Sequence, residues 1–296
     1  MTIGYTAVDS QLMYGEESAW GTGVATTKSF GNAPNLESFT MNKNYVPSRG
    51  SGNREAVAMK QGRYDASFSI SFDMTSDLDW LQYVLTDVEG TPTDSWTAGP
   101  APKSLTVAWT RPQGATNAII TLAGCVITNA EISINEGEVI RVTLSFVSKR
   151  PVITTGSALV PTYADESLTF ADACLTVGAT TYKLVQSVSL GIETGCELRG
   201  GLCSTEPTAY RIGGYAYSLS ITHMLNSVDE LLATAVADAL LSGKVRIMTG
   251  ATTYIDIEFT DAGFNTYDTS AVADEDITET VEALPLSIEI STGSTA

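Results

Sequence analysis

Few residues of this chain have the types and spacing that catalysis requires. His223 is the only histidine among the 296 residues, so a Ser-His-Asp or Cys-His enzyme would have to centre on it. It stands at the end of a strand-like segment, where a histidine that hydrogen-bonds within the fold is the ordinary occupant. The sequence also contains no phosphate-binding loop, dinucleotide fingerprint, nucleophile elbow or His-Glu-x-x-His motif. We therefore predict that the protein is not an enzyme and holds no cofactor.

Two groups of carboxylates deserve comparison with glycosidase and calcium sites. Asp256 and Glu258 alternate with apolar residues, which places both on the polar face of a predicted strand. Asp274, Glu275 and Asp276 are consecutive in a predicted solvated loop, without the spacing of an EF-hand. A glycosidase pair needs only closeness in space, so that alternative stays open. We predict no metal site.

The four cysteines follow no zinc-ligand pattern. Six residues separate Cys196 from Cys203, whereas Cys125 and Cys174 are isolated. This usage favours buried, reduced cysteines in a cytoplasmic setting, with a Cys196–Cys203 loop disulfide as the alternative.

The charge balance excludes a surface built to bind nucleic acid. The chain has 34 acidic and 16 basic residues, a formal net charge of −18 and a pI near 4.3. Proteins that grip phosphates have the opposite balance. The hydrophobic fraction of 43% is sufficient for a folded core, and no run of 18 apolar residues predicts a membrane span. The N-terminus has no secretory signal pattern, so we expect a soluble protein with no membrane partner.

The elements that must position these residues are predicted to be strands. Between Gly62 and Asp73, Phe68 and Ile70 alternate with Ser67 and Ser69, which predicts a strand with one buried and one wet face. A short α-helix is predicted over residues 76–85, with Ser76 as its N-cap.

The same strand-and-helix unit occurs twice. Residues 213–221 resemble residues 62–70 at an offset of 151, and Ser227–Leu232 resembles Ser76–Leu81. Weaker matches follow in the same order. They pair 38–41 with 187–190, 105–109 with 245–248, 119–122 with 254–257, and 139–147 with 284–290. Their order predicts a tandem duplication of a domain rather than a solenoid repeat. The predicted fold is mainly β, with two tandem β-sandwich or barrel domains that each carry one short α-helix.

This repeat sets the expected domain boundaries. Residues 1–35 are rich in Gly, Thr and Ala and are predicted to form an extended N-terminal arm. The first domain is expected over 36–155 and the second over 181–296, with residues 156–180 as the linker and the start of the second copy.

Several motifs resemble those of a known family. The segment Gly15-Glu-Glu-Ser-Ala-Trp-Gly-Thr22 is similar to the start of tail tube proteins (major tail proteins) of long-tailed phages and related archaeal viruses. The strands 62–70 and 214–221, and the pair 124–134 and 137–146, resemble later motifs of that family in the same order. The resemblance covers nearly the whole chain.

The resemblance implies a virion structural protein, assembled in the host cytoplasm, whose sheets join around rings that stack into a hollow tail tube. Tape-measure, tail-tip and tail-terminator proteins are the implied partners, and DNA passes through the lumen without specific binding. A chain with two tube domains would form a ring from three subunits, a pseudo-hexameric trimer. An acidic lumen would repel the DNA backbone. The candidates for the lumen are Asp65, Ser67, Ser69, Asp256 and Glu258, and those for contacts between rings are Arg49 and Arg199.

Two other classes remain open at this point. A capsid decoration or surface β protein would share the acidic β composition but would not polymerise. A calcium- or carbohydrate-binding module would account for the acidic clusters.

Overall fold

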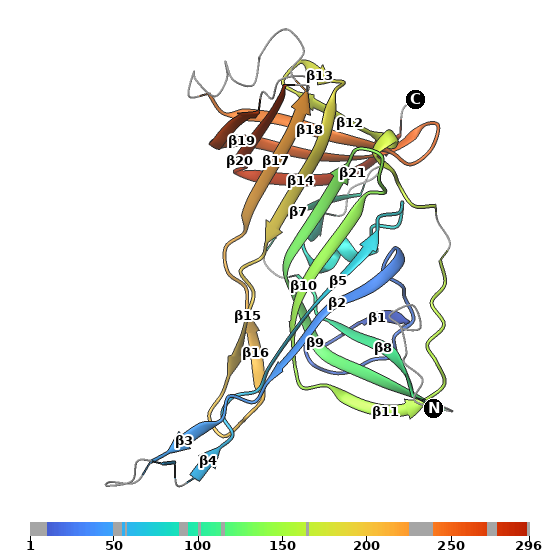
Figure 1. Ribbon diagram of the computed structural model, residues 1–296. Helices are drawn as coiled ribbons and strands as arrows, with labels where there is room; N and C mark the ends of the chain where they lie inside the picture. Colours follow the sequence, from blue (N-terminus) through green and yellow to red (C-terminus); the bar gives the residue numbers. More distant parts are fainter. Residues whose placement is uncertain are drawn as a thin grey trace.

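The computed structural model describes residues 11–49, 55–56, 58–88, 94–99, 102–113, 116–163, 166–224, 239–270 and 277–294. These residues form an almost entirely β structure in which every strand pairing is antiparallel, as the alternating sequence predicts (Figure 1). No helix among them is long and apolar enough to cross a membrane.

One large sheet, here called the composite sheet, runs through the whole molecule. Its strands pair in the order β2–β5–β10–β9–β14–β17–β20–β19. Strands β9 and β19 contribute only their C-terminal parts. The bounds are β2 (Asn32–Asn42), β5 (Asp65–Asp73), β9 (Thr116–Asn135), β10 (Arg141–Ser148), β14 (Val185–Glu193), β17 (Ala216–Met224), β19 (Thr253–Ser270) and β20 (Thr278–Leu284).

Two further sheets, the first and second covering sheets, share one hydrophobic core with the composite sheet. The first contains β1 (Leu12–Glu16), β8 (Leu105–Gln113), the N-terminal part of β9, and β11 (Val152–Gly156). The second contains β13 (Thr180–Tyr182), β12 (Ala173–Val177), β18 (Leu241–Met248), the N-terminal part of β19, β21 (Ser287–Ser294), β7 (Ser95–Thr97) and β6 (Thr86–Val88). Because β9 and β19 each belong to two sheets, they tie the covering sheets to the composite sheet.

Two hairpins extend from the lower end of the composite sheet in Figure 1. The first hairpin is formed by β3 (Val46–Ser48) and β4 (Ala58–Lys60), between β2 and β5. The second hairpin is formed by β15 (Glu197–Gly200) and β16 (Pro207–Arg211), between β14 and β17.

The strand order and the pairing register repeat along the composite sheet. Strands β2–β5–β10–β9, here called the first set, are followed by β14–β17–β20–β19, the second set. Ser38 pairs with Ser69 as Ser189 pairs with Ser220, a shift of 151 positions in both strands. Ser133 pairs with Arg141 as Ser270 pairs with Thr278, a shift of 137. The shift of 151 agrees with the offset found between 62–70 and 213–221.

The remaining sequence matches differ from the strand pairing in register, and one of them joins the wrong strand. By strand pairing, β2 aligns with β14 two residues later than the match of 38–41 with 187–190. Strand β8 aligns with β18 from Leu241, not from Val245, and β10 aligns with β20 rather than with 284–290. Alternating strands match one another at any even shift, so similarity alone does not fix their register.

The alternation predicted for β5 is confirmed. Ala66, Phe68, Ile70 and Phe72 are buried, and Ser67 on the opposite face is exposed. Phe68 stacks against Phe146 of β10 with ring centroids 4.6 Å apart.

The predicted α-helix is instead a short 3-10 helix, η2 (Asp79–Tyr83), and Ser76 is not its N-cap. The N–H of Leu81 donates to the carbonyl of Leu78, an i to i−3 bond. Trp80, Leu81 and Tyr83 are buried, whereas Asp79 is exposed and pairs with Lys28. The second predicted helix, 227–232, lies outside the described residues. A second short element, η3 (Phe170–Asp172), begins with a capping box at Thr169.

The expectation of an N-terminal arm is wrong for the described part of residues 1–35. Strand β1 pairs with β8, with Leu12 opposite Trp109, and Leu12, Tyr14 and Phe30 are buried in the core. The partner strand is about a hundred positions away, so no local pattern signals the pairing.

Glu17 gives the motif from Gly15 to Thr22 a structural role, because this glutamate is only 6% exposed and is hydrogen-bonded on both carboxylate oxygens. One carboxylate oxygen accepts hydrogen bonds from Thr106 Oγ1 and the Gly124 N–H, each at 2.8 Å. The other accepts from Ser104 Oγ at 2.8 Å and the Gly21 N–H at 2.7 Å. Glu17 thus fastens the turn after β1 to β8 and β9.

Candidate functional site

The candidate site is the polar face of the composite sheet, the face directed away from the core. On β9, β14 and β20 it presents residues such as Ser133, Ser189 and Glu282, which lie in one row across the sheet. The row alternates with buried residues such as Ile132 and Leu190. The face therefore results from the period of two in each strand, repeated over all the strands.

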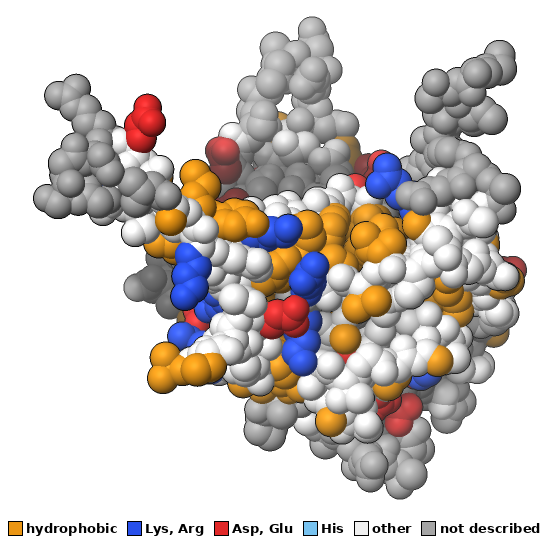
Figure 2. Space-filling view, turned by 90° about the horizontal axis from the view of Figure 1, so that it is seen from below, with side chains coloured by type: hydrophobic (Ala, Val, Ile, Leu, Met, Phe, Trp, Pro, Cys, Tyr) orange, Lys and Arg blue, Asp and Glu red, His pale blue; other side chains and the backbone are white. Residues whose placement is uncertain are grey.

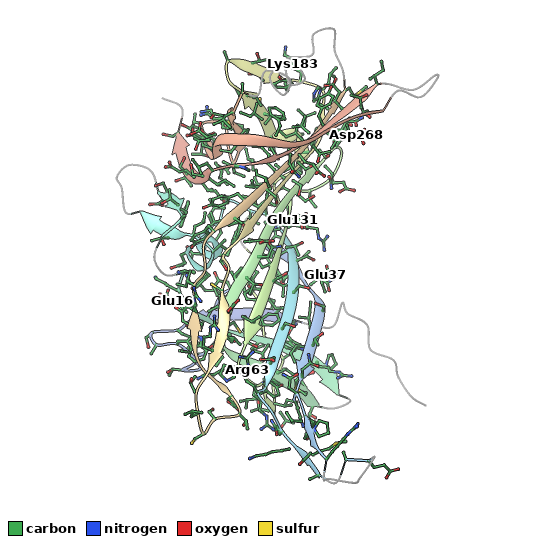
Figure 3. The ribbon with its side chains drawn as sticks, turned by 90° about the vertical axis from the view of Figure 1, so that its left-hand side faces the viewer. Glu16, Glu37, Arg63, Glu131, Lys183 and Asp268 are labelled. Carbon is green, nitrogen blue, oxygen red and sulfur yellow. The ribbon has the colours of Figure 1, made fainter. Side chains whose placement is uncertain are left out.

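Acidic side chains dominate this face. Among the described residues of its strands, Arg141 is the one basic side chain placed on it. In Figure 3, Asp268, Glu131 and Glu37 follow one another down the sheet. The carboxylates that register and alternation place on the face are Glu37, Asp65, Asp73, Glu131, Glu193, Asp268 and Glu282.

Arg141 is held by its neighbours. Its Nη2 donates to Ser71 Oγ at 2.8 Å and lies 3.6 Å from Glu37 Oε1. The Ser71 hydroxyl donates in turn to Glu37, and this hydrogen bond holds the pKa of the Glu37 carboxyl below its ordinary value, with Arg141 acting in the same direction. The single cation is therefore engaged in the sheet's own hydrogen bonds.

An open hollow lies on the same face where β9 meets β14. It has a volume of about 400 Å³, and Glu131, Glu193 and Ser218 are among its lining residues. Gly191 leaves room there, because a Cβ at that position would lie 2.4 Å from Ser218 Oγ.

Asp65, Ser67 and Ser69, which the sequence suggested as a group, lie together on this face. Asp65 accepts hydrogen bonds from Arg63 Nε at 2.9 Å and Asn44 Nδ2 at 2.6 Å. Ser69 and Ser38 share a hydrogen bond of 2.8 Å between β5 and β2.

Asp256 and Glu258 do not lie on the polar face of the composite sheet. Both lie in the part of β19 that belongs to the second covering sheet, and their side chains alternate with the buried Ile255 and Ile257. Asp256 is 4% exposed and accepts hydrogen bonds from Arg246 Nε and Nη2, both at 2.7 Å, and from Lys244 Nζ at 3.2 Å. Burial raises the pKa of the Asp256 carboxyl, but the hydrogen bonds from Arg246 and Lys244 outweigh it and the net shift is downward. Glu258, the second member of the pair, lies 3.6 Å from Lys244.

Arg49 and Arg199 both lie on the projecting hairpins. Arg49 follows β3 and is exposed. Arg199 is in β15, where its Nη2 lies 2.7 Å from Glu197 Oε2 in an exposed pair. The two are not equivalent in register, since Ser48 of β3 corresponds to Arg199.

The remaining candidates from the sequence are His223, the four cysteines and the acidic run Asp274–Asp276. His223 Nε2 lies 3.1 Å from Glu279 Oε2, and both residues are buried between β17 and β20. All four cysteines are free; Cys125 and Cys196 are buried as expected, whereas Cys174 and Cys203 are exposed, contrary to expectation. No group of three potential metal ligands occurs among the described residues, and Asp274–Asp276 lie outside them.

Sequence reasoning missed the larger part of the acidic face. Glu131, Glu193 and Glu282 each stand in an alternating segment, so their exposure was predictable. Their common surface depends on which strands are neighbours, and only the structure supplies that.

Comparison with known proteins gives one result. A sequence model of a family described as phage tail tube protein matches residues 7–293, almost the full chain. No curated protein matches the chain.

Proposed function

We propose that this chain, which belongs to the phage tail tube protein family, polymerises into stacked rings in which the composite sheet continues from copy to copy around a hollow lumen. As a member of that family it is a structural component of the phage tail. The observation that carries the proposal is the repeated strand order of the composite sheet. The sheet ends at β2, of the first set, on one side and at β19, of the second set, on the other.

The two edge strands, β19 and β2, occupy positions that allow them to pair with each other in neighbouring copies. Inside the chain, β9 of the first set pairs with β14 of the second. Strands β19 and β2 occupy the equivalent positions at the two ends, so β19 of one copy is suited to pair with β2 of the next. Such a head-to-tail contact uses two different surfaces and closes into a ring when the rotation permits.

The exposure of apolar residues on β2 supports this pairing. Phe39 and Met41 are 37% and 44% exposed, whereas the equivalent Leu190 and Ile192 of β14 are 3% and 0% exposed. The difference is the neighbouring strand: β14 is covered by β9, and β2 has no such neighbour among the described residues. A second copy would bury both side chains and satisfy the open edge.

We further propose that the chain is a tandem duplication, with domains at 36–155 and 181–296 and residues 156–180 between them. Each chain would supply two four-stranded units, so three chains would complete a ring of six units, and three times eight strands gives 24. The matching registers of the two sets support this arrangement.

We place the polar face of the composite sheet toward the lumen. Its carboxylates would repel the DNA phosphates, so the genome would slide past without binding. Asp65, Ser67 and Ser69 stay lumen candidates, whereas Asp256 and Glu258 belong to another surface. Arg49 and Arg199, on the hairpins, stay candidates for contacts between rings. Assembly in the host cytoplasm and the tape-measure, tail-tip and terminator partners are part of the same proposal.

A disulfide at the edge tests the pairing. The β9–β14 register, in which Glu131 lies opposite Gly191, places Asp268 of one copy opposite Thr40 of the next. Facing residues on antiparallel strands have Cα atoms about 4.5–5.5 Å apart, within disulfide range. We therefore expect Thr40→Cys with Asp268→Cys, in a background with Cys174→Ser and Cys203→Ser, to form a covalently closed ring in assembled tubes.

The matched control moves one cysteine by one position. Thr40→Cys with Thr269→Cys places the second thiol on the opposite face of β19 and is expected to cross-link poorly. Equal cross-linking of both pairs, or none in tubes that do assemble, would contradict the proposed edge.

A further inference from the structure

The second hairpin is docked within its own chain. Cys196 and Leu198 of this hairpin region pack with Val126 of β9 in a small hydrophobic cluster, against which Val147 and Tyr210 also pack. The cluster lies beside the junction of the two strand sets. It fixes the second hairpin to the first set.

Further contacts hold the same hairpin. The Tyr210 ring lies 5.9 Å from the Trp20 ring, and the Tyr64 N–H donates to the Thr205 carbonyl at 2.7 Å. The Arg63 Nη1 also reaches the Leu198 carbonyl at 3.5 Å.

The first hairpin has the same pairing register as the second, but its described apolar side chains are exposed. Val46 pairs with Lys60 as Glu197 pairs with Arg211, a shift of 151 in both strands. By this shift Tyr45 corresponds to Cys196, Pro47 to Leu198 and Met59 to Tyr210. Tyr45 is 55% and Met59 72% exposed, whereas Cys196 is 5% exposed. Figure 2, which views the molecule from this end, shows hydrophobic side chains gathered there beside Lys and Arg side chains.

In the first set, Val147 packs on the small hydrophobic cluster, and Lys149 Nζ lies 4.4 Å from the centroid of the Trp20 ring, which also packs on it. The shift of 137 between β10 and β20 makes Leu284 the equivalent of Val147 and Leu286 the equivalent of Lys149. A backbone bond supports this alignment, since the Leu286 N–H donates to Thr260 as the Lys149 N–H donates to Ala123. Leu284 and Leu286 are 55% and 74% exposed.

We propose that the first hairpin of each copy docks Tyr45 and Met59 onto Leu284 and Leu286 of the neighbouring copy. The proposal rests on the proposed ring, because pairing β19 with β2 of the next copy sets up the relation that β9 and β14 have inside the chain. The occupant of the exposed leucines is therefore a second copy of this chain. The contact brings four exposed apolar side chains out of water at each boundary between chains.

Thiol cross-linking with a short bismaleimide tests the docking. Met59→Cys with Leu284→Cys, in the Cys174→Ser and Cys203→Ser background, is expected to join neighbouring copies in tubes. Met59→Cys with Val160→Cys is the matched control, since Val160 is 77% exposed but lies outside the equivalent surface. It is expected to give little product.

The strength of the contact is measured by the protein concentration at which tubes form. Met59→Asp and Leu284→Asp are each expected to raise it at least about tenfold, which corresponds to about 1.4 kcal/mol per contact, and Val160→Asp is expected to leave it unchanged. All three sites are exposed, and the monomer's melting temperature verifies that each variant folds.

The Thr40→Cys and Asp268→Cys disulfide separates the two ideas. If that edge pair cross-links while Met59 and Leu284 do not, and the aspartate variants assemble normally, the docking is wrong and the ring stands. Loss of both cross-links in tubes would overturn the ring and the docking with it.

Discussion

Replacing Glu17 by alanine provides a quantitative test of how the N-terminal motif stabilises the fold. The substitution removes the carboxylate that accepts four hydrogen bonds, donated by Ser104, Thr106, Gly21 and Gly124. The two hydroxyls can rotate toward other acceptors, but the two backbone N–H groups cannot. Each unsatisfied group costs about 1–3 kcal/mol, so we expect the two groups together to make Glu17→Ala lower the free energy of unfolding by about 2–6 kcal/mol.

The expected change is measurable by thermal unfolding of the unassembled chain. With an unfolding entropy of about 2.1 cal/mol/K per residue, a loss of this size lowers the melting temperature by about 3–10 °C. Glu17→Gln keeps one oxygen but turns an NH₂ group toward one of the backbone N–H donors, so we expect a smaller loss of about 1–3 kcal/mol.

Glu16 is the matched control. It is the adjacent carboxylate, but its side chain is 42% exposed and it pairs with Lys103 at 2.8 Å. An exposed ion pair contributes less than about 1 kcal/mol, so Glu16→Gln is expected to leave the melting temperature almost unchanged. Equal effects of Glu16→Gln and Glu17→Gln would refute the argument that buried hydrogen bonds, rather than charge, give the motif its role.

Three other outcomes follow from the structure. Asp256→Asn is expected to lower the free energy of unfolding by about 2–3 kcal/mol at neutral pH, since it weakens hydrogen bonds from Arg246 and Lys244. Because the pKa of Asp256 is lowered by folding, this difference is complete above the ordinary aspartate pKa and disappears as the pH falls through the lowered value; denaturant unfolding at several pH values tests this. Glu131→Lys with Glu282→Lys is expected to leave tubes intact and slow genome ejection in single-virion assays, and unchanged ejection would contradict the lumen assignment. Phe39→Asp with Met41→Asp is expected to yield a folded monomer that forms no tubes, and normal tube assembly of that variant in electron micrographs would count against the β2 edge.

Local alternation predicted individual strands well. Phe68, Ile70 and Ser67 fall on the faces that the sequence indicates, because the period of two is a property of the backbone. The offset of 151 between residues 62–70 and 213–221 is also the shift between the β2–β5 and β14–β17 pairings.

What the sequence could not supply was the identity of neighbouring strands. Asp256 and Asp65 both alternate with apolar residues, yet they lie in different sheets, and only Asp256 is enclosed by two cations. Leu12 joins the core through a partner strand far along the chain. The register of the repeat likewise depends on backbone pairing, which a two-residue slip in alternating sequence leaves undetermined.

The number of chains in one ring tests the central claim most directly. Electron cryomicroscopy of tubes, viewed along the axis and reconstructed, is expected to give threefold rings. Each ring would have an unbroken inner sheet in which β19 of one chain pairs with β2 of the next. Six chains in a ring, or an inner sheet formed by strands other than those of the composite sheet, would contradict it.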